Sequence, residues 1–194
     1  MTSTLLPKDL IPLETYAHER AGFRTEGIAH RRDRTVQVGR NAMLIFEDER
    51  TVRYQIQEML HVEGISEDAG IQAEIDVYAP LIPDGNNFKA TFMLEFPDEA
   101  ERRARLAQLI GVENRVWIQI DGSARVFAVA DEDMDRTDAD KTSAVHFLRF
   151  ELEKPMVREL KQGRPLSIGI DHPSYNASLV LGDSVRKSLL NDLR

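Results

Sequence analysis

Apolar and polar side chains alternate most regularly between Lys141 and Leu152, and this alternation predicts a β-strand. Successive side chains of a strand point to opposite faces. One face carries a histidine among apolar residues, namely Ala144, His146, Leu148, Phe150 and Leu152. The other face becomes charged at Arg149 and Glu151. We therefore expect His146 to point into the core, where an imidazole needs a hydrogen-bond partner or a metal ion.

Shorter apolar runs, separated by glycine, proline and other turn residues, predict the remaining elements. Further strands are expected at residues 35–38, 42–46, 88–96, 116–120, 124–130, 166–170 and 177–181. Helices are expected at about residues 8–21, 48–62, 66–78, 98–111, 155–163 and 183–194. Gly22 is expected to end the first helix, because glycine commonly closes helices.

Several neighbouring strands are expected to pair as hairpins, since Gly39-Arg40-Asn41 and Asp121-Gly122 are short turn sequences between apolar runs. Several strands also have one polar face, which is typical of antiparallel sheets. We therefore predict an α+β fold, in which helices pack against an antiparallel or mixed β-sheet. The 194 residues fit a single domain, 1–194, that ends in a helix at 183–194.

The composition is that of an ordinary soluble globular protein, with 42% hydrophobic and 30% charged residues. No apolar run approaches the roughly 20 residues of a membrane helix. Residues 1–9 lack the basic start and apolar segment of a secretory signal. We therefore expect a cytoplasmic protein that does not act at a membrane.

The formal net charge of −8 disfavours binding to nucleic acid or anionic lipid. One local exception is the basic run His30-Arg31-Arg32-Asp33-Arg34. We expect this run to be a solvated face, and the alternative is a docking patch for an acidic partner.

The chain contains no cysteine, which excludes disulfides, thiolate metal sites, cysteine nucleophiles and protein-ligated iron–sulfur clusters. The sequence motifs of nucleotide-binding loops, serine hydrolases and zincins are also missing. A bound metal would therefore need histidine and carboxylate ligands, a set that suits iron, manganese or zinc.

Glu58 and His61 form a Glu-x-x-His pair that is a candidate metal site. Residues three apart on a helix share one face. Di-iron bundle proteins use two such motifs together with two more glutamates, whereas this chain has one. The alternative is an ordinary solvated helix face.

Four further residues are candidates for ligand binding: His146, Arg149, Asp171 and His172. Asp171 and His172 are expected in a loop between two strands, where functional groups tend to collect, although they also suit a turn. Arg149 beside Glu151 is expected either to hold an anionic ligand or to join a cross-strand ion-pair ladder. We expect the histidines at positions 146 and 172 to converge on one cavity.

The segment 131–140 imitates the start of a calcium-binding loop but departs from it at two positions. The sixth position is Arg136 instead of glycine, and the twelfth is Thr142 instead of glutamate. We therefore expect a mobile acidic loop that does not bind calcium. A lid or docking segment is the alternative, because the loop is long for a connector.

Several blocks together resemble the bacterial family called domain of unknown function 3501, over about residues 8–181. The blocks include residues 38–39, 44–47, 55–60, 78–85, 128–133, 141–150 and 168–173. The family has no established activity, so the resemblance implies no catalytic residue. It implies a place near redox or oxidative-stress chemistry, with a rubrerythrin-like protein or an iron–sulfur oxidoreductase as protein partner. The position of His61 is more often arginine in the family, which weakens the metal hypothesis for that pair.

Three hypotheses about function follow. The first is an accessory protein of a redox system that acts through a protein partner. The second is a small metal-binding protein or enzyme, in which His146 and His172, with Asp171 or Glu58, bind a divalent ion while Arg149 holds an anionic substrate. The third is a non-catalytic module that binds an anionic metabolite through Arg149.

Overall fold

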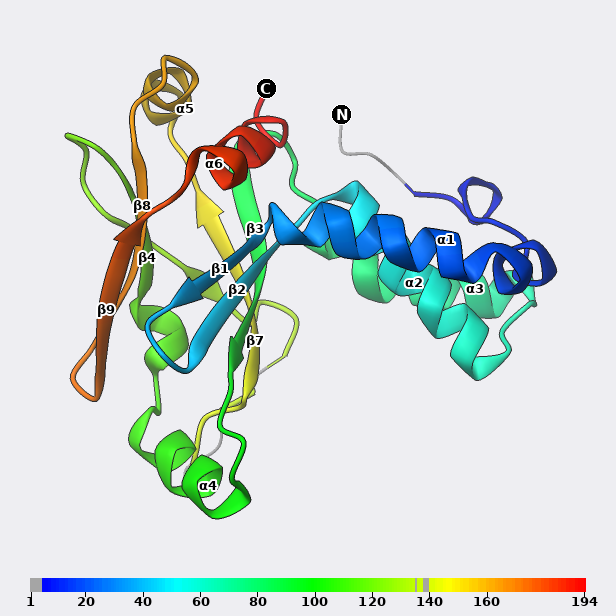
Figure 1. Ribbon diagram of the computed structural model, residues 1–194, viewed down its shortest axis with the longest axis horizontal. Helices are drawn as coiled ribbons and strands as arrows, with labels where there is room; N and C mark the ends of the chain where they lie inside the picture. The colour runs from blue at the N-terminus through cyan, green and yellow to red at the C-terminus, as the bar shows by residue number, and fades with distance from the viewer. Residues whose placement is uncertain (1–4, 135, 138–139) are drawn as a thin grey trace.

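The described strands pair antiparallel throughout and form two sheets (Figure 1). The computed structural model describes residues 5–134, 136–137 and 140–194. The first sheet has the order β1 (Thr35–Val38), β2 (Ala42–Glu47), β3 (Asn87–Leu94), β7 (Val145–Glu151), β6 (Val129–Ala130). The second has the order β5 (Val126–Phe127), β4 (Val116–Ile120), β8 (Leu166–His172), β9 (Tyr175–Val180). The predicted α+β class is confirmed.

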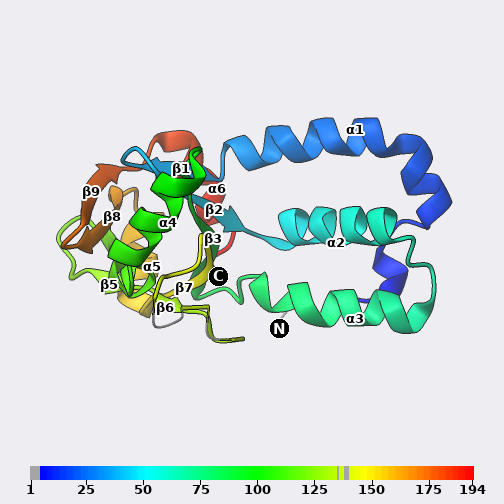
Figure 2. The same cartoon turned by 90° about the horizontal axis from the view of Figure 1, so that it is seen from below.

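Three helices project from the sheets as an arm, in which they lie side by side (Figure 2). They are α1 (Leu13–Arg32), α2 (Glu49–Glu63) and α3 (Asp68–Tyr78), with the short 3-10 helices η1 (Pro7–Asp9) and η2 (Ala79–Leu81). The other helices are α4 (Glu99–Gln108), η3 (Val112–Arg115), α5 (Lys154–Lys161) and α6 (Asp183–Leu190). Within the described residues, no helix is both long enough and apolar enough to cross a membrane.

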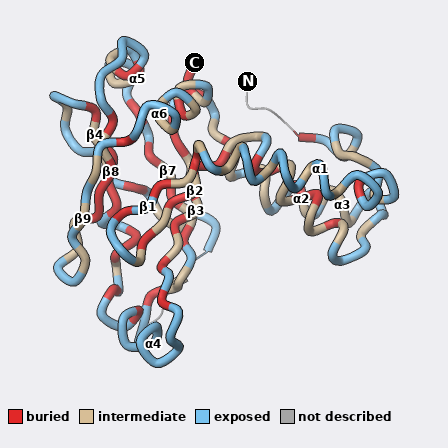
Figure 3. The backbone as a smooth tube through the Cα atoms, viewed as in Figure 1, coloured by how far each residue is buried: buried red, intermediate tan, exposed pale blue. Residues whose placement is uncertain are grey.

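The buried apolar side chains form two clusters. The larger cluster joins side chains of both sheets, and Figure 3 shows many buried residues along these strands. The smaller cluster lies inside the arm and contains Leu5, Val52, Ile56, Leu60, Ile75 and Ile82. Only one face of the five-stranded sheet is therefore used for the main core, and the arm carries a core of its own.

Strand β7 has the alternation that the sequence predicts. His146, Leu148 and Phe150 are buried, and they lie beside residues of β3 such as Phe92, which pairs with His146. The strand begins later than expected, because residues 141–144 belong to the chain segment that returns from the acidic loop. The inward orientation of His146 is thus confirmed.

The first helix is longer than predicted, because it continues through Gly22 and ends at Arg32. The prediction that Gly22 ends the helix was wrong, and Gly22 lies inside α1 with open space around it. A second glycine of this helix, Gly27, serves helix packing. A Cβ atom at Gly27 would lie 3.2 Å from the ring of Tyr54 on α2, so glycine lets the two helices approach closely.

The chain changes sheets at Ala128. Residues 124–130 were expected to form one strand, but β5 pairs with β4 while β6 pairs with β7 in the other sheet. The Ala128 amide still donates to the Val116 carbonyl at 2.9 Å. This crossing brings the residue after β6, Asp131, beside β7.

Arg34 joins the arm, the five-stranded sheet and the C-terminus. Its guanidinium is 1% exposed and donates to the backbone carbonyls of Phe46 and Glu47 at 2.8 and 2.9 Å. It also pairs with Asp192 at 2.5 Å and with Asp48, the N-cap of α2, at 3.4 Å. Burial raises the pKa of Asp192 to about 6, and the neighbouring Arg34 opposes this rise.

The basic run around Arg34 is therefore mostly used inside the protein, and the expected solvated face was wrong. His30 pairs with Asp48 at 2.7 Å, and Arg31 lies over the ring of Tyr54. Arg32 is the member of the run whose side chain is exposed.

We predict that Arg34→Met destabilises the protein by about 3–5 kcal/mol, because it leaves a buried carboxylate and two buried carbonyls without their donor. Arg32→Met is the matched control, and an exposed substitution of this kind is expected to change stability by less than about 0.5 kcal/mol. Urea unfolding of both variants measures the difference. Equal stability of the two variants would contradict the role assigned to Arg34.

Candidate functional site

His146 is the centre of a buried polar network. Its Nδ1 lies 2.5 Å from Asp131 Oδ2, and its Nε2 lies 2.9 Å from Thr142 Oγ1 and 3.1 Å from the Ser143 carbonyl. Glu113 of η3 closes the far side, with Oε2 at 3.9 Å from His146 Nε2. His146 is 0% exposed and Thr142 is 1% exposed. The imidazole is thus hydrogen-bonded on both sides, as a buried polar ring requires.

The backbone at Asp131 is built for this contact. Asp131 has φ +50°, a left-handed conformation that aspartate tolerates better than most residues. Its amide donates to the Phe147 carbonyl at 2.8 Å, and its Oδ1 accepts from the Phe147 amide at 3.0 Å. Arg136 also donates to Oδ1 at 3.2 Å, and its guanidinium lies over the Phe147 ring. These contacts orient the Asp131 carboxylate independently of its hydrogen bond to the imidazole.

The order carboxylate, imidazole, hydroxyl is also the order of a nucleophilic triad. The burial of Thr142 argues against that chemistry, because a substrate has no access to a hydroxyl with 1% exposure. His146 instead connects both ends of the acidic segment: Asp131 follows β6, and Thr142 precedes β7. The network closes a loop, of which residues 135, 138 and 139 lie outside the described part of the chain.

Arg149 projects from the opposite face of β7 and is already paired. It donates twice to Glu132, at 2.8 and 2.9 Å, and once to Glu151 at 2.6 Å. These carboxylates raise the pKa of Arg149 further above its usual value. The arrangement is the ion-pair ladder that the sequence left open as an alternative, and an anionic ligand would have to displace two acids.

Asp171 and His172 belong to the end of strand β8 and not to a loop, so that part of the prediction was wrong. Asp171 accepts from Arg125 at 3.2 Å and from Asn176 at 3.4 Å. His172 Nδ1 accepts from the Ser174 amide at 3.1 Å, and Nε2 lies 3.3 Å from the Ile110 carbonyl. These contacts hold the turn between β8 and β9.

The structure does not bring the two histidines at positions 146 and 172 together. They lie in different sheets, and their hydrogen-bond partners in the described chain are different residues. Among the described residues, no group of three or more histidine and carboxylate side chains is placed to hold a metal ion. A divalent metal therefore stays a prediction from the sequence, for which the described part of the chain offers no set of ligands.

Glu58 is held by the arm. Arg20 of α1 donates to both of its oxygens at 2.8 and 2.7 Å, and the buried Tyr16 hydroxyl donates at 2.6 Å. The Arg20 guanidinium lowers the pKa of Glu58 to about 2, and burial raises that of Tyr16. His61 lies edge-on to the Tyr16 ring, with centroids 5.9 Å apart. Glu58 thus serves to join α1 to α2.

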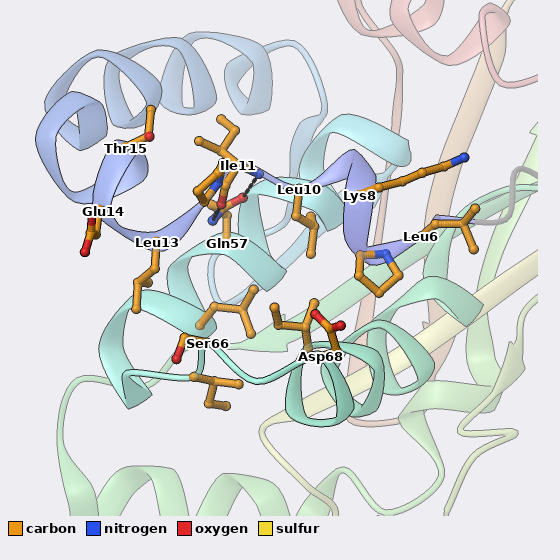
Figure 4. Close-up of a pocket in the computed structure, with 15 residues that line it drawn as sticks. Leu6, Lys8, Leu10, Ile11, Leu13, Glu14, Thr15, Gln57, Ser66 and Asp68 are labelled. Atoms are coloured by element: carbon orange, nitrogen blue, oxygen red, sulfur yellow. Dashed lines mark hydrogen bonds between the residues drawn. The ribbon is translucent and has the colours of Figure 1, made fainter.

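A groove of about 930 Å³ lies at the tip of the arm (Figure 4). One wall is the N-terminal segment, and the other is formed by α2 and the start of α3. Ile11 is fixed to α2 because its amide and carbonyl both bond to the Gln57 side chain, at 3.0 and 2.9 Å. The lining is mostly apolar and consists of Leu6, Pro7, Leu10, Ile11, Pro12, Leu13, Leu60, Ile65 and Ile71, with Lys8, Glu14, Thr15, Gln57, Ser66 and Asp68.

Only some of these features have a signal in the amino-acid sequence. Asp131 and Thr142 flank the acidic segment in the sequence. Because this segment is a loop that joins two strands, its two ends could have been expected to lie close together, near His146. Glu113 carries no sequence signal, because η3 is placed beside His146 by the tertiary fold. The groove is signalled by apolar residues that lie between Pro7 and Pro12 and do not follow a helical period.

The chain belongs to the family described as Protein of unknown function (DUF3501), whose model matches residues 4–193. The family resemblance noted in the sequence is confirmed. A crystal structure of a novel protein of unknown function from Burkholderia pseudomallei is similar to this chain, with 51% sequence identity and a TM-score of 0.94. The match covers 98% of this chain and 100% of that one. No curated protein matches the chain.

We predict that His146→Leu destabilises the protein by about 2–4 kcal/mol, because it removes the partner of the Asp131 carboxylate, which is only 9% exposed. His18→Leu, on the exposed surface of α1, is the control and should change stability by less than about 0.5 kcal/mol. Thermal and urea unfolding measure both effects. An unchanged midpoint for His146→Leu would show that the network does not hold the loop.

We predict that Glu58→Gln removes part of the acid sensitivity of stability. The folded pKa of Glu58, about 2, is below its ordinary value of 4.5. The unfolded state therefore binds more protons in this interval, and the stabilisation from Glu58 is present above pH 4.5 and lost as pH falls toward 2. Urea unfolding from pH 6 to pH 3 should show a smaller loss for the variant. Parallel curves for the two proteins would contradict this account.

Proposed function

We propose that this protein is a cytoplasmic accessory protein of a redox or oxidative-stress system and that it acts by binding a protein partner. The main support for this proposal is the apolar groove at the tip of the arm. Its lining is mostly hydrocarbon, and charged groups such as Lys8, Glu14 and Asp68 accompany it. An apolar centre with a polar rim is typical of protein–protein interfaces.

The position of the groove supports a macromolecular ligand. The arm projects away from both sheets, so its tip is open to a large partner (Figure 2). The groove runs between the N-terminal segment and two helices, a geometry that accepts an amphipathic helix of a partner. We therefore propose a helix with an apolar face as the segment that is bound.

The internal chemistry of the chain also favours a binding role. His146, Arg149 and Glu58 each have hydrogen-bonded partners within the protein and stabilise its folded structure. The chain has no cysteine with which to ligate an iron–sulfur cluster. Electron transfer would therefore reside in the partner, and the family resemblance implies a rubrerythrin-like protein or an iron–sulfur oxidoreductase.

We predict that the double variant Leu6→Glu, Leu13→Glu weakens binding to the partner at least tenfold, because a docked helix would bury unpaired carboxylates. Calorimetric titration against the purified rubrerythrin-like protein and the iron–sulfur oxidoreductase of the same organism measures the affinity. Val62→Glu is the matched control, since Val62 is an apolar residue of the same arm, is 71% exposed and is absent from the groove lining.

The control variant should bind as the wild type does, and circular dichroism should show the same helix content in all three proteins. Wild-type protein that binds neither candidate would contradict the redox assignment. Binding that survives the double variant unchanged would contradict the assignment of the groove.

A further inference from the structure

A second cavity lies where the arm meets the outer face of the five-stranded sheet, and it has a volume of about 320 Å³. Apolar side chains of both elements line it, including Ile45, Met93, Val145 and Phe147 from the sheet and Val52 from α2. This size is within the range of small-molecule sites. The cavity shares no lining residue with the arm-tip groove.

The cavity contains a buried carboxylate, that of Glu47. Glu47 is 7% exposed, and its two oxygens accept hydrogen bonds from the Thr51 and Thr91 hydroxyls, at 2.5 and 2.7 Å. Both donors are neutral. In the part of the chain that the structure describes, Glu47 forms no ion pair with a lysine, arginine or histidine. A carboxylate this buried ordinarily has a cationic partner.

The lysine nearest in register does not serve as that partner. Lys89 on β3 pairs directly with Glu47 on β2, so their side chains share the outer face. The Lys89 ammonium instead donates to the Pro80 carbonyl at 2.6 Å, and burial lowers its pKa. The space beside Glu47 therefore lacks the positive charge that the strand pairing would supply.

A basic group lies at another point of the cavity wall. Among the described residues, Arg31 Nε is buried without a hydrogen-bond acceptor, while its NH2 reaches Gln55 Oε1 at a long 3.5 Å and its guanidinium lies over the Tyr54 ring. The residues of α2 that Arg31 and Glu47 contact, Gln55 and Thr51, are four apart and lie on one face of the helix. An unpaired donor and a carboxylate without a cationic partner thus line the same cavity.

We propose that this cavity binds an apolar α-amino acid. Its ammonium group would pair with Glu47, its carboxylate would accept from Arg31, and its side chain would contact the sheet residues Met93, Val145 and Phe147. An α-amino acid carries an ammonium and a carboxylate on one carbon atom, and the cavity wall offers a carboxylate and a guanidinium as their respective partners. This inference is independent of the partner that the arm tip binds.

Calorimetric titration with three probes of similar shape tests the proposal. L-leucine carries both charges, isopentylamine carries only the ammonium and 4-methylpentanoate carries only the carboxylate. We expect L-leucine to bind at least tenfold more tightly than isopentylamine, and 4-methylpentanoate to show no binding. No heat of binding for L-leucine at millimolar concentration overturns the proposal, and equal affinity for isopentylamine overturns the role of Arg31.

Two variants and a control locate the site. Glu47→Gln should weaken L-leucine binding at least tenfold, whereas Glu95→Gln, an exposed glutamate just beyond β3, should leave it unchanged. Val145→Trp fills the cavity from its rim, where Val145 is 38% exposed, and leaves the buried carboxylate intact. It should abolish binding even if Glu47→Gln fails to fold. L-leucine binding that is unchanged in Val145→Trp would place the ligand elsewhere and overturn the assignment.

Discussion

The buried guanidinium of Arg34 is the interaction on which the arrangement of the molecule depends. It lies at the start of β1, directly after the arm helix α1, and it bonds to the end of β2, to the N-cap of α2 and to Asp192 near the C-terminus. Arginine suits this place, because a planar group with five donors satisfies several acceptors at once. One side chain therefore sets the direction in which the arm leaves the sheets.

The polar residues that are candidates for function in the sequence are likewise hydrogen-bonded to other groups of the protein. His146 lies between Asp131 and Thr142, Arg149 between Glu132 and Glu151, and Glu58 against Arg20 and Tyr16. These networks hold, respectively, the two ends of a loop, one face of a sheet and a pair of helices together. The two sites that we propose for external ligands lie elsewhere, at the tip of the arm and in the angle between the arm and the sheet.

Local patterns in the sequence predicted the elements better than they predicted the site. The alternation around His146 gave both the strand and its inward face, since period-two patterning directly reflects which side is buried. Gly22 misled because a glycine inside a helix has the same local sequence signal as a glycine that ends one, and α1 continues through it with open space around that position. The expected convergence of His146 and His172 failed because two sheets, and not one, carry them. No pattern in the sequence marked Glu47 as a candidate. Glu47 has no ion pair with Lys89 because the Lys89 ammonium donates to the Pro80 carbonyl instead, and that orientation is set by the tertiary fold.

Hydrogen exchange of the amides, measured with and without each of the two candidate partner proteins, tests most directly the proposal that the arm presents a binding surface. We expect slower exchange on complex formation within residues 6–15 and 57–71, and unchanged exchange in the strands of both sheets. Protection that falls on the sheets and leaves the arm tip unchanged would contradict it.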